Sequence, residues 1–135
     1  MIKRIALILV LSLAPSLAGA TDLQVTDSKG TVVVVKNAVV DYGGMLTADA
    51  DSDGIRVQQG DGLVRLKWAA VQSLSVTKVD TEAKPARVDL EVTLTSGTHT
   101  AATLLRKGAM TLSGKSELGD YTIGLEKVRR IVPLR

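Results

Sequence analysis

The segment DADSDG, residues 49–54, carries three aspartates at alternate positions and ends on a glycine. Asp49, Asp51 and Asp53 have the spacing with which the first half of an EF-hand loop offers carboxylate oxygens to Ca²⁺, and Gly54 takes the turn position. The three aspartates are therefore the candidate metal ligands. We predict no cofactor for this chain, with calcium at this loop as the alternative.

The second half of the loop does not supply the remaining oxygens of an EF-hand. Positions 9 and 12 are Val57 and Gly60, and the alternating residues IRVQQ indicate a strand instead of a flanking helix. A remote carboxylate, from Asp61 or Asp41, could complete a calcium shell of another kind. The alternative is an acidic turn, because aspartate and glycine are favoured turn residues. Both interpretations stay open.

Catalytic chemistry has little support in the sequence. The chain has no cysteine, and its single histidine, His99, lies on a predicted strand or its edge. No serine carries the surroundings of a nucleophile elbow. One histidine without thiols also does not make an ordinary zinc site. We therefore predict no catalytic residues and no enzyme.

The first 20 residues have the pattern of a secretory signal peptide. Lys3 and Arg4 precede an apolar run over residues 5–17, and Ala18-Gly19-Ala20 supplies the small residues that a signal peptidase reads. The run is shorter than the roughly 20 residues of a spanning helix, and no cysteine is present for a lipid anchor. We expect residues 1–20 to be removed, leaving a periplasmic or secreted protein without a membrane span.

The charge of the mature chain argues against a polyanionic partner. Loss of Lys3 and Arg4 leaves 15 of the 17 basic residues against 14 acidic ones, a net charge of +1. Nucleic-acid binding needs a strongly basic surface, commonly with aromatic residues interleaved. Here the terminal basic cluster is interpreted as a solvated face, and the expected partner is another envelope protein. The cluster comprises Lys127, Arg129, Arg130 and Arg135.

Hydrophobic alternation predicts an all-β fold. Short alternating runs separated by turn residues recur along the chain, and valine, leucine and isoleucine supply a core that favours strands. In LVRLKW, Val64, Leu66 and Trp68 share the expected inner face. The apolar run TVVVVKNAVV from Thr31 is interpreted as a strand buried on both faces. Without cysteines, apolar packing alone must stabilise the domain.

Two parts of the chain match each other. DLQVTDSKGT at residues 22–31 matches DLEVTLTSGT at residues 89–98, and residues 62–74 match residues 119–131 in their apolar positions. Duplication explains the match better than chance similarity between β-rich segments. We predict two similar small β-barrels or half-barrels packed as one compact domain. Their boundaries are a first β repeat at 21–76, a connector at 77–87 and a second β repeat at 88–135.

Each copy ends with apolar residues three positions apart, which predicts one tight helical turn before a final strand. These residues are Trp68, Val71 and Leu74 in the first copy, and Leu125, Val128 and Ile131 in the second. This ending resembles that of Sm-like small β-barrels, and the resemblance implies a fold without an activity. The sequence thus predicts an exported, non-enzymatic binding or structural module of the bacterial envelope, with a weak calcium-binding module as the alternative.

Overall fold

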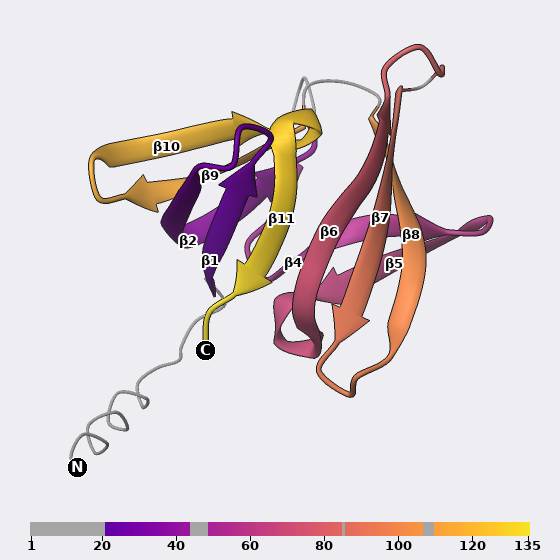
Figure 1. The fold of residues 1–135 in the computed structure, drawn as a ribbon, viewed down its shortest axis with the longest axis horizontal. Coiled ribbons are helices and arrows are strands. Elements are labelled where there is room, and N and C mark those ends of the chain that lie inside the picture. Colours follow the sequence, from indigo (N-terminus) through magenta and orange to yellow (C-terminus); the bar gives the residue numbers. More distant parts are fainter. Residues whose placement is uncertain (1–20, 44–48, 85, 107–109) are drawn as a thin grey trace.

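The computed structural model describes residues 21–43, 49–84, 86–106 and 110–135. The predicted signal peptide, residues 1–20, lies outside the described residues. The described chain is all-β, with eleven strands and two single 3₁₀ turns (Figure 1). The elements are β1 (Thr21–Asp27), β2 (Val32–Asp41), β3 (Ala50–Asp51), β4 (Gly54–Gln59), β5 (Gly62–Lys67), η1 (Trp68–Ala70), β6 (Val71–Asp80), β7 (Ala86–Leu94), β8 (His99–Arg106), β9 (Thr111–Ser116), β10 (Gly119–Gly124), η2 (Leu125–Lys127) and β11 (Val128–Pro133).

The described strands form one curled, antiparallel half-barrel sheet in the order β10-β9-β2-β1-β11-β6-β7-β8-β4-β5, with β3 paired to the end of β2. We call β10-β9-β2-β1-β11 the first half-sheet and β6-β7-β8-β4-β5 the second half-sheet. Figure 1 shows them side by side, with β11 and β6 at their junction. This junction is short, since Arg130 pairs with Ser75 and Ile131 with Leu74.

The two half-sheets repeat the same strand order. Read from the outer edge, the first is β10-β9-β2-β1-β11 and the second is β5-β4-β8-β7-β6. The pairing registers agree as well. Val25 lies opposite Ile131 and Val33, while Val92 lies opposite Leu74 and Thr100. Positions along β1, β2 and β11 near Val25 therefore have structural counterparts along β7, β8 and β6.

Backbone hydrogen bonds outside the strands repeat in the same way. Ser28 N donates to Lys127 O at 2.9 Å, and Thr95 N donates to Ala70 O at 3.0 Å. These bonds place the β1–β2 turn on η2 and the β7–β8 turn on η1, so one hairpin turn contacts the 3₁₀ turn of each half-sheet. Trp68 N and Leu125 N, at the starts of η1 and η2, likewise donate to the carbonyls of Asp53 and Met110. The predicted 3₁₀ turns are confirmed at both sites.

The strand pairing groups the chain differently from the expected repeats. The first half-sheet combines β1 and β2, which lie in residues 21–76, with β9, β10 and β11, which lie in residues 88–135. Residues 77–80 of the expected connector extend β6, and residues 86–87 begin β7. β6 and β7 pair as one long hairpin. The neighbour of β6 is therefore β7, and not β1 of the same expected repeat.

The core follows the predicted alternation. Leu23 and Val25 on β1, and Leu90 and Val92 on β7, are fully buried, and Trp68 is buried at the start of η1. Alternate side chains of a strand point to opposite faces, so each of these strands directs one row into the core. None of the described polar or charged residues is buried. Apolar packing is thus the main stabilising contribution among the described residues.

The expectation that the apolar run from Thr31 is buried on both faces is wrong. Val35 and Val40 of β2 are buried, but Val32 and Val34 are 53% and 43% exposed. The reason is that the half-barrel covers only the inner face of β2. Burial of both faces requires a layer on each side of a strand, and no described element covers the outer face at Val32 and Val34.

Candidate functional site

The DADSDG loop lies where the end of β2 meets β3 and β4. Asp51 closes β3 and pairs with Val40, while Asp53 directly precedes β4. The described residues also include Asp49, whose carbonyl accepts a hydrogen bond from Tyr42 N at 2.8 Å. Sequence analysis placed the three aspartates in one loop; in the structure Asp51 belongs to the short strand β3, and Asp49 and Asp53 lie on either side of it.

The three carboxylates form ion pairs with three cations of the chain itself, Arg56, Lys67 and, at the longer distance of 3.9 Å from Asp51, Arg65. The Arg56 guanidinium contacts Asp49 at 2.9 Å and Asp51 at 3.0 Å. Lys67 Nζ contacts Asp53 at 2.6 Å across the β4–β5 hairpin, and this hydrogen bond lowers the pKa of Asp53. Arg56 therefore binds Asp49 and Asp51, while Lys67 binds Asp53 separately, so the three carboxylates do not share one partner. Among the described residues, no group of three or more acidic or histidine side chains could hold a metal ion.

Tyr42 completes the cluster around Asp51. Its hydroxyl donates to Asp51 Oδ2 at 2.9 Å and accepts from Arg56 N at 2.9 Å. The Arg56 guanidinium lies over the tyrosine ring, 4.5 Å from its centroid, a cation–π arrangement. Burial raises the pKa of Tyr42 above its ordinary value. Sequence analysis missed Tyr42 and Arg56, because each acts through a contact that forms only when β3 pairs with β2 and the chain turns from β3 into β4.

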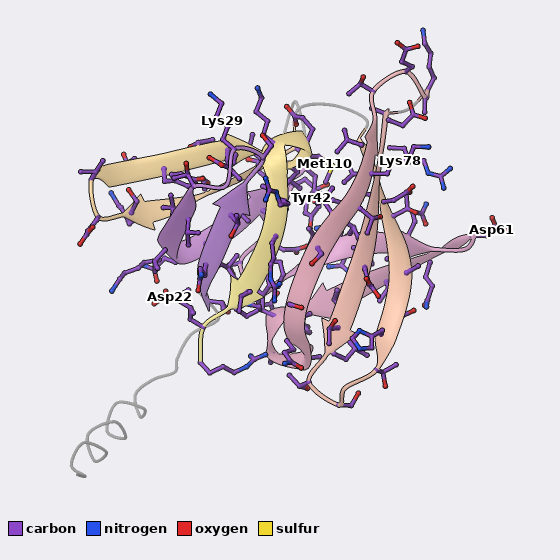
Figure 2. All side chains as sticks on the ribbon, viewed as in Figure 1. Asp22, Lys29, Tyr42, Asp61, Lys78 and Met110 are labelled. Atoms are coloured by element: carbon purple, nitrogen blue, oxygen red, sulfur yellow. The ribbon has the colours of Figure 1, made fainter. Side chains whose placement is uncertain are left out.

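A cavity of about 470 Å³ adjoins this cluster. It extends from Tyr42 and Met110, near the junction of the half-sheets, to Asp61 at the tip of the β4–β5 hairpin (Figure 2). Arg56, Gln58 and Thr103 also line it. Its polar groups can donate and accept hydrogen bonds, but Arg56 is already held by two carboxylates.

His99 lies at the start of β8 with its side chain 65% exposed. Its Nδ1 is 3.0 Å from Thr93 Oγ1 and 4.0 Å from Glu91. Its position on a strand confirms the sequence expectation. These two neighbours do not form the serine–histidine–aspartate arrangement of a nucleophilic site.

A second hollow lies on the first half-sheet. This groove, of about 600 Å³, lies between the start of β2 and the β9–β10 hairpin. Val32, Val34, Leu118 and Tyr121 contribute its apolar lining, and Lys36 is among its polar residues. We call it the β2 groove. Sequence analysis missed it, because the run of valines was interpreted as core.

Comparison of the chain with protein-family models, curated proteins and solved structures found no match. In the described part of the chain, no helix has the length and hydrophobicity needed to cross a membrane.

Proposed function

We propose that this protein is an exported, non-enzymatic β-rich binding module of the bacterial envelope, and that its partner is another envelope protein. The signal-peptide pattern of residues 1–20 supports export. The observation that carries the binding role is the β2 groove, where exposed apolar side chains border a strand. Soluble proteins rarely expose such patches unless they contact a partner.

We also infer that the chain arose by duplication and that its two halves are related to Sm-like small β-barrels. The repeated strand order, the matched registers and the paired 3₁₀ turns support this inference. Duplication leaves two copies of every surface, so one copy is free to acquire a binding role while the other only maintains the fold.

Capture from an envelope extract tests the proposed function. Residues 21–135, immobilised on a support, should retain a specific envelope protein that the heat-denatured chain does not retain. Retention should be equal in EDTA and in millimolar calcium, because Arg56 and Lys67 already bind the loop carboxylates.

Two other outcomes would count against the proposal. Retention only with calcium, lost on substitution of Asp49, Asp51 and Asp53 by asparagine, would favour the calcium-binding alternative. No retained protein under either condition, after crosslinking to trap weak complexes, would contradict the binding role.

A further inference from the structure

The β2 groove borders a length of strand with an unpaired edge. On one side, Val32, Val33 and Val34 pair with β1. On the other side, β9 last pairs with β2 at Lys36 and Lys115, because β9 ends at Ser116 and turns into β10. Among the described strands, nothing pairs with this side of Val32–Val34. Backbone N–H and C=O groups of an unpaired edge are a template for another strand.

Apolar side chains surround that edge. Val32 and Val34 are 53% and 43% exposed, and Leu118 at the hairpin tip is fully exposed. Val33 and Tyr121 are partly buried against the core and border the same groove. An added strand would therefore find backbone partners along β2 and apolar contacts on both of its faces, the combination used in strand addition.

The second half-sheet provides an internal comparison. By the matched registers, the counterparts of Val32 and Val34 are His99 and Ala101 on β8. The counterpart of Leu118 is Asp61, because each lies one residue before the first residue of the returning strand, Gly119 in one hairpin and Gly62 in the other. The counterparts of Val33 and Val34, Thr100 and Ala101, line a smaller hollow of about 160 Å³ there. The fold therefore does not require apolar residues at these positions, and their presence on the first half-sheet needs another explanation.

The charge around the groove limits what can occupy it. Lys36 forms no ion pair with any described residue, whereas Lys115 is paired with Asp120. Glu117 is the acidic residue of the groove. Two copies of the chain paired along Val32–Val34 would gather their exposed lysines, Lys29 and Lys36, at one edge, which is unfavourable. An acyl chain would cover the strand edge without satisfying its hydrogen bonds.

We propose that the β2 groove binds an extended segment of the partner protein by strand addition to Val32–Val34. This segment has small apolar residues and an acidic residue at the end nearest Lys36. The inference rests on the proposed function and specifies the chemistry of the partner at that groove.

Calorimetric titration with synthetic peptides tests this inference. The probe is a capped peptide that alternates valine and threonine behind an N-terminal aspartate, DVTVTVT. An antiparallel strand along Val32–Val34 runs in the same direction as β9, so its N-terminus lies at the end of this segment nearest Lys36. We expect KVTVTVT to bind about threefold more weakly, because an exposed ion pair contributes little. DVTPTVT should not bind, since proline removes a backbone donor.

The matched variant carries Val32→His, Val34→Ala and Leu118→Asp, the residues that the second half-sheet has at the same positions. It should keep the melting temperature of the wild type and bind DVTVTVT at least about tenfold more weakly. Val79→Ala, at an exposed valine of β6, is the control and should bind as the wild type does. Lys36→Glu should reverse the preference, so that KVTVTVT binds more tightly than DVTVTVT.

Several results would overturn the inference. These are equal binding of the proline peptide, unchanged binding by the matched variant, or no reversal by Lys36→Glu. A wild-type dimer in sedimentation that the matched variant dissociates would assign the groove to a second copy instead. If the chain captures an envelope protein equally well with and without the matched substitutions, the proposed function stands and the inference about the groove fails.

Discussion

At the scale of residues, the acidic loop is neutralised from within the chain. Arg56 links Asp49 and Asp51, and its ring contact with Tyr42 fixes the guanidinium in place. Lys67 holds Asp53 separately, and Arg65 lies 3.9 Å from Asp51. A loop with three carboxylates therefore reaches near-neutral local charge without a metal ion. The ion pairs are partly exposed, so each contributes modestly to stability.

The Tyr42 hydroxyl makes the cluster sensitive to alkaline pH. Burial raises the pKa of Tyr42 in the native state. As the pH rises, the unfolded state therefore loses this proton before the native state does. The unfolded state then binds fewer protons, and stability falls as pH rises above about 10. We expect Tyr42→Phe to lower the free energy of unfolding by about 1–2 kcal/mol at pH 7, since two hydrogen bonds are lost. Urea denaturation between pH 7 and 11 measures both effects.

The pH profile separates this explanation from simple loss of packing. Above pH 10, stability should fall less steeply in Tyr42→Phe than in the wild type. Tyr121→Phe is the control, because no hydrogen bond to the Tyr121 hydroxyl occurs among the described residues. This substitution should lower the free energy of unfolding at pH 7 by less than Tyr42→Phe does. Parallel profiles for wild type and Tyr42→Phe would contradict the role assigned to the hydroxyl.

The sequence was sufficient to locate the acidic loop but not its partners. The spacing of Asp49, Asp51 and Asp53 is visible in the printed chain. Lys67 is 14 residues from Asp53 and contacts it only because β4 and β5 form a hairpin. Whether neighbouring carboxylates converge or separate depends on such contacts, which local spacing does not specify.

At the scale of elements, each 3₁₀ turn lies within one half-sheet, η1 between β5 and β6 and η2 between β10 and β11. Each turn accepts a hydrogen bond from a β-hairpin turn, and η1 is also contacted by the end of the chain. The Arg135 guanidinium, which follows β11, donates to Trp68 O at 3.3 Å and to Val71 O. Arg135, which follows the last strand of the first half-sheet, is thus bound by the second half-sheet beside the short β11–β6 junction.

Arg135→Ala should therefore weaken the link between the half-sheets. We expect the free energy of unfolding to fall by about 1–2 kcal/mol, because hydrogen bonds from a charged donor are lost. Thermal and urea denaturation measure the change. Arg130→Ala, an exposed arginine of β11, should change stability by less than about 0.5 kcal/mol. Equal effects of the two substitutions would indicate a general charge effect instead.

Elements were predictable where the period of the sequence was clear. The inner face of β5 and both 3₁₀ turns follow from apolar residues two and three positions apart. The valines from Val32 to Val35 have no such period, and the sequence could not distinguish a strand buried on both faces from one buried on a single face. The exposure of Val32 and Val34 is set by tertiary structure, since no layer covers that side.

At the scale of the whole molecule, two half-sheets share one strand order and differ in their surfaces. Sequence analysis predicted an all-β protein with a repeated pattern, and the all-β architecture is confirmed. It did not predict which strands pair. The matching openings at Asp22 and Asp89 give β1 and β7 nearly the same alternation, so local pattern cannot decide whether β1 lies beside β6 or beside β11. The long β6–β7 hairpin decides this in the folded chain.

The central claim is that the β2 groove binds a partner strand and that the corresponding surface of the second half-sheet does not. Titration of ¹⁵N-labelled residues 21–135 with the peptide DVTVTVT, followed by nuclear magnetic resonance, tests it within a single molecule. We predict amide shift changes at Val32–Val34 and Leu118 and none at the counterpart residues His99–Ala101 and Asp61. Equal changes at both grooves, or changes confined to the cavity beside Tyr42, would contradict the claim.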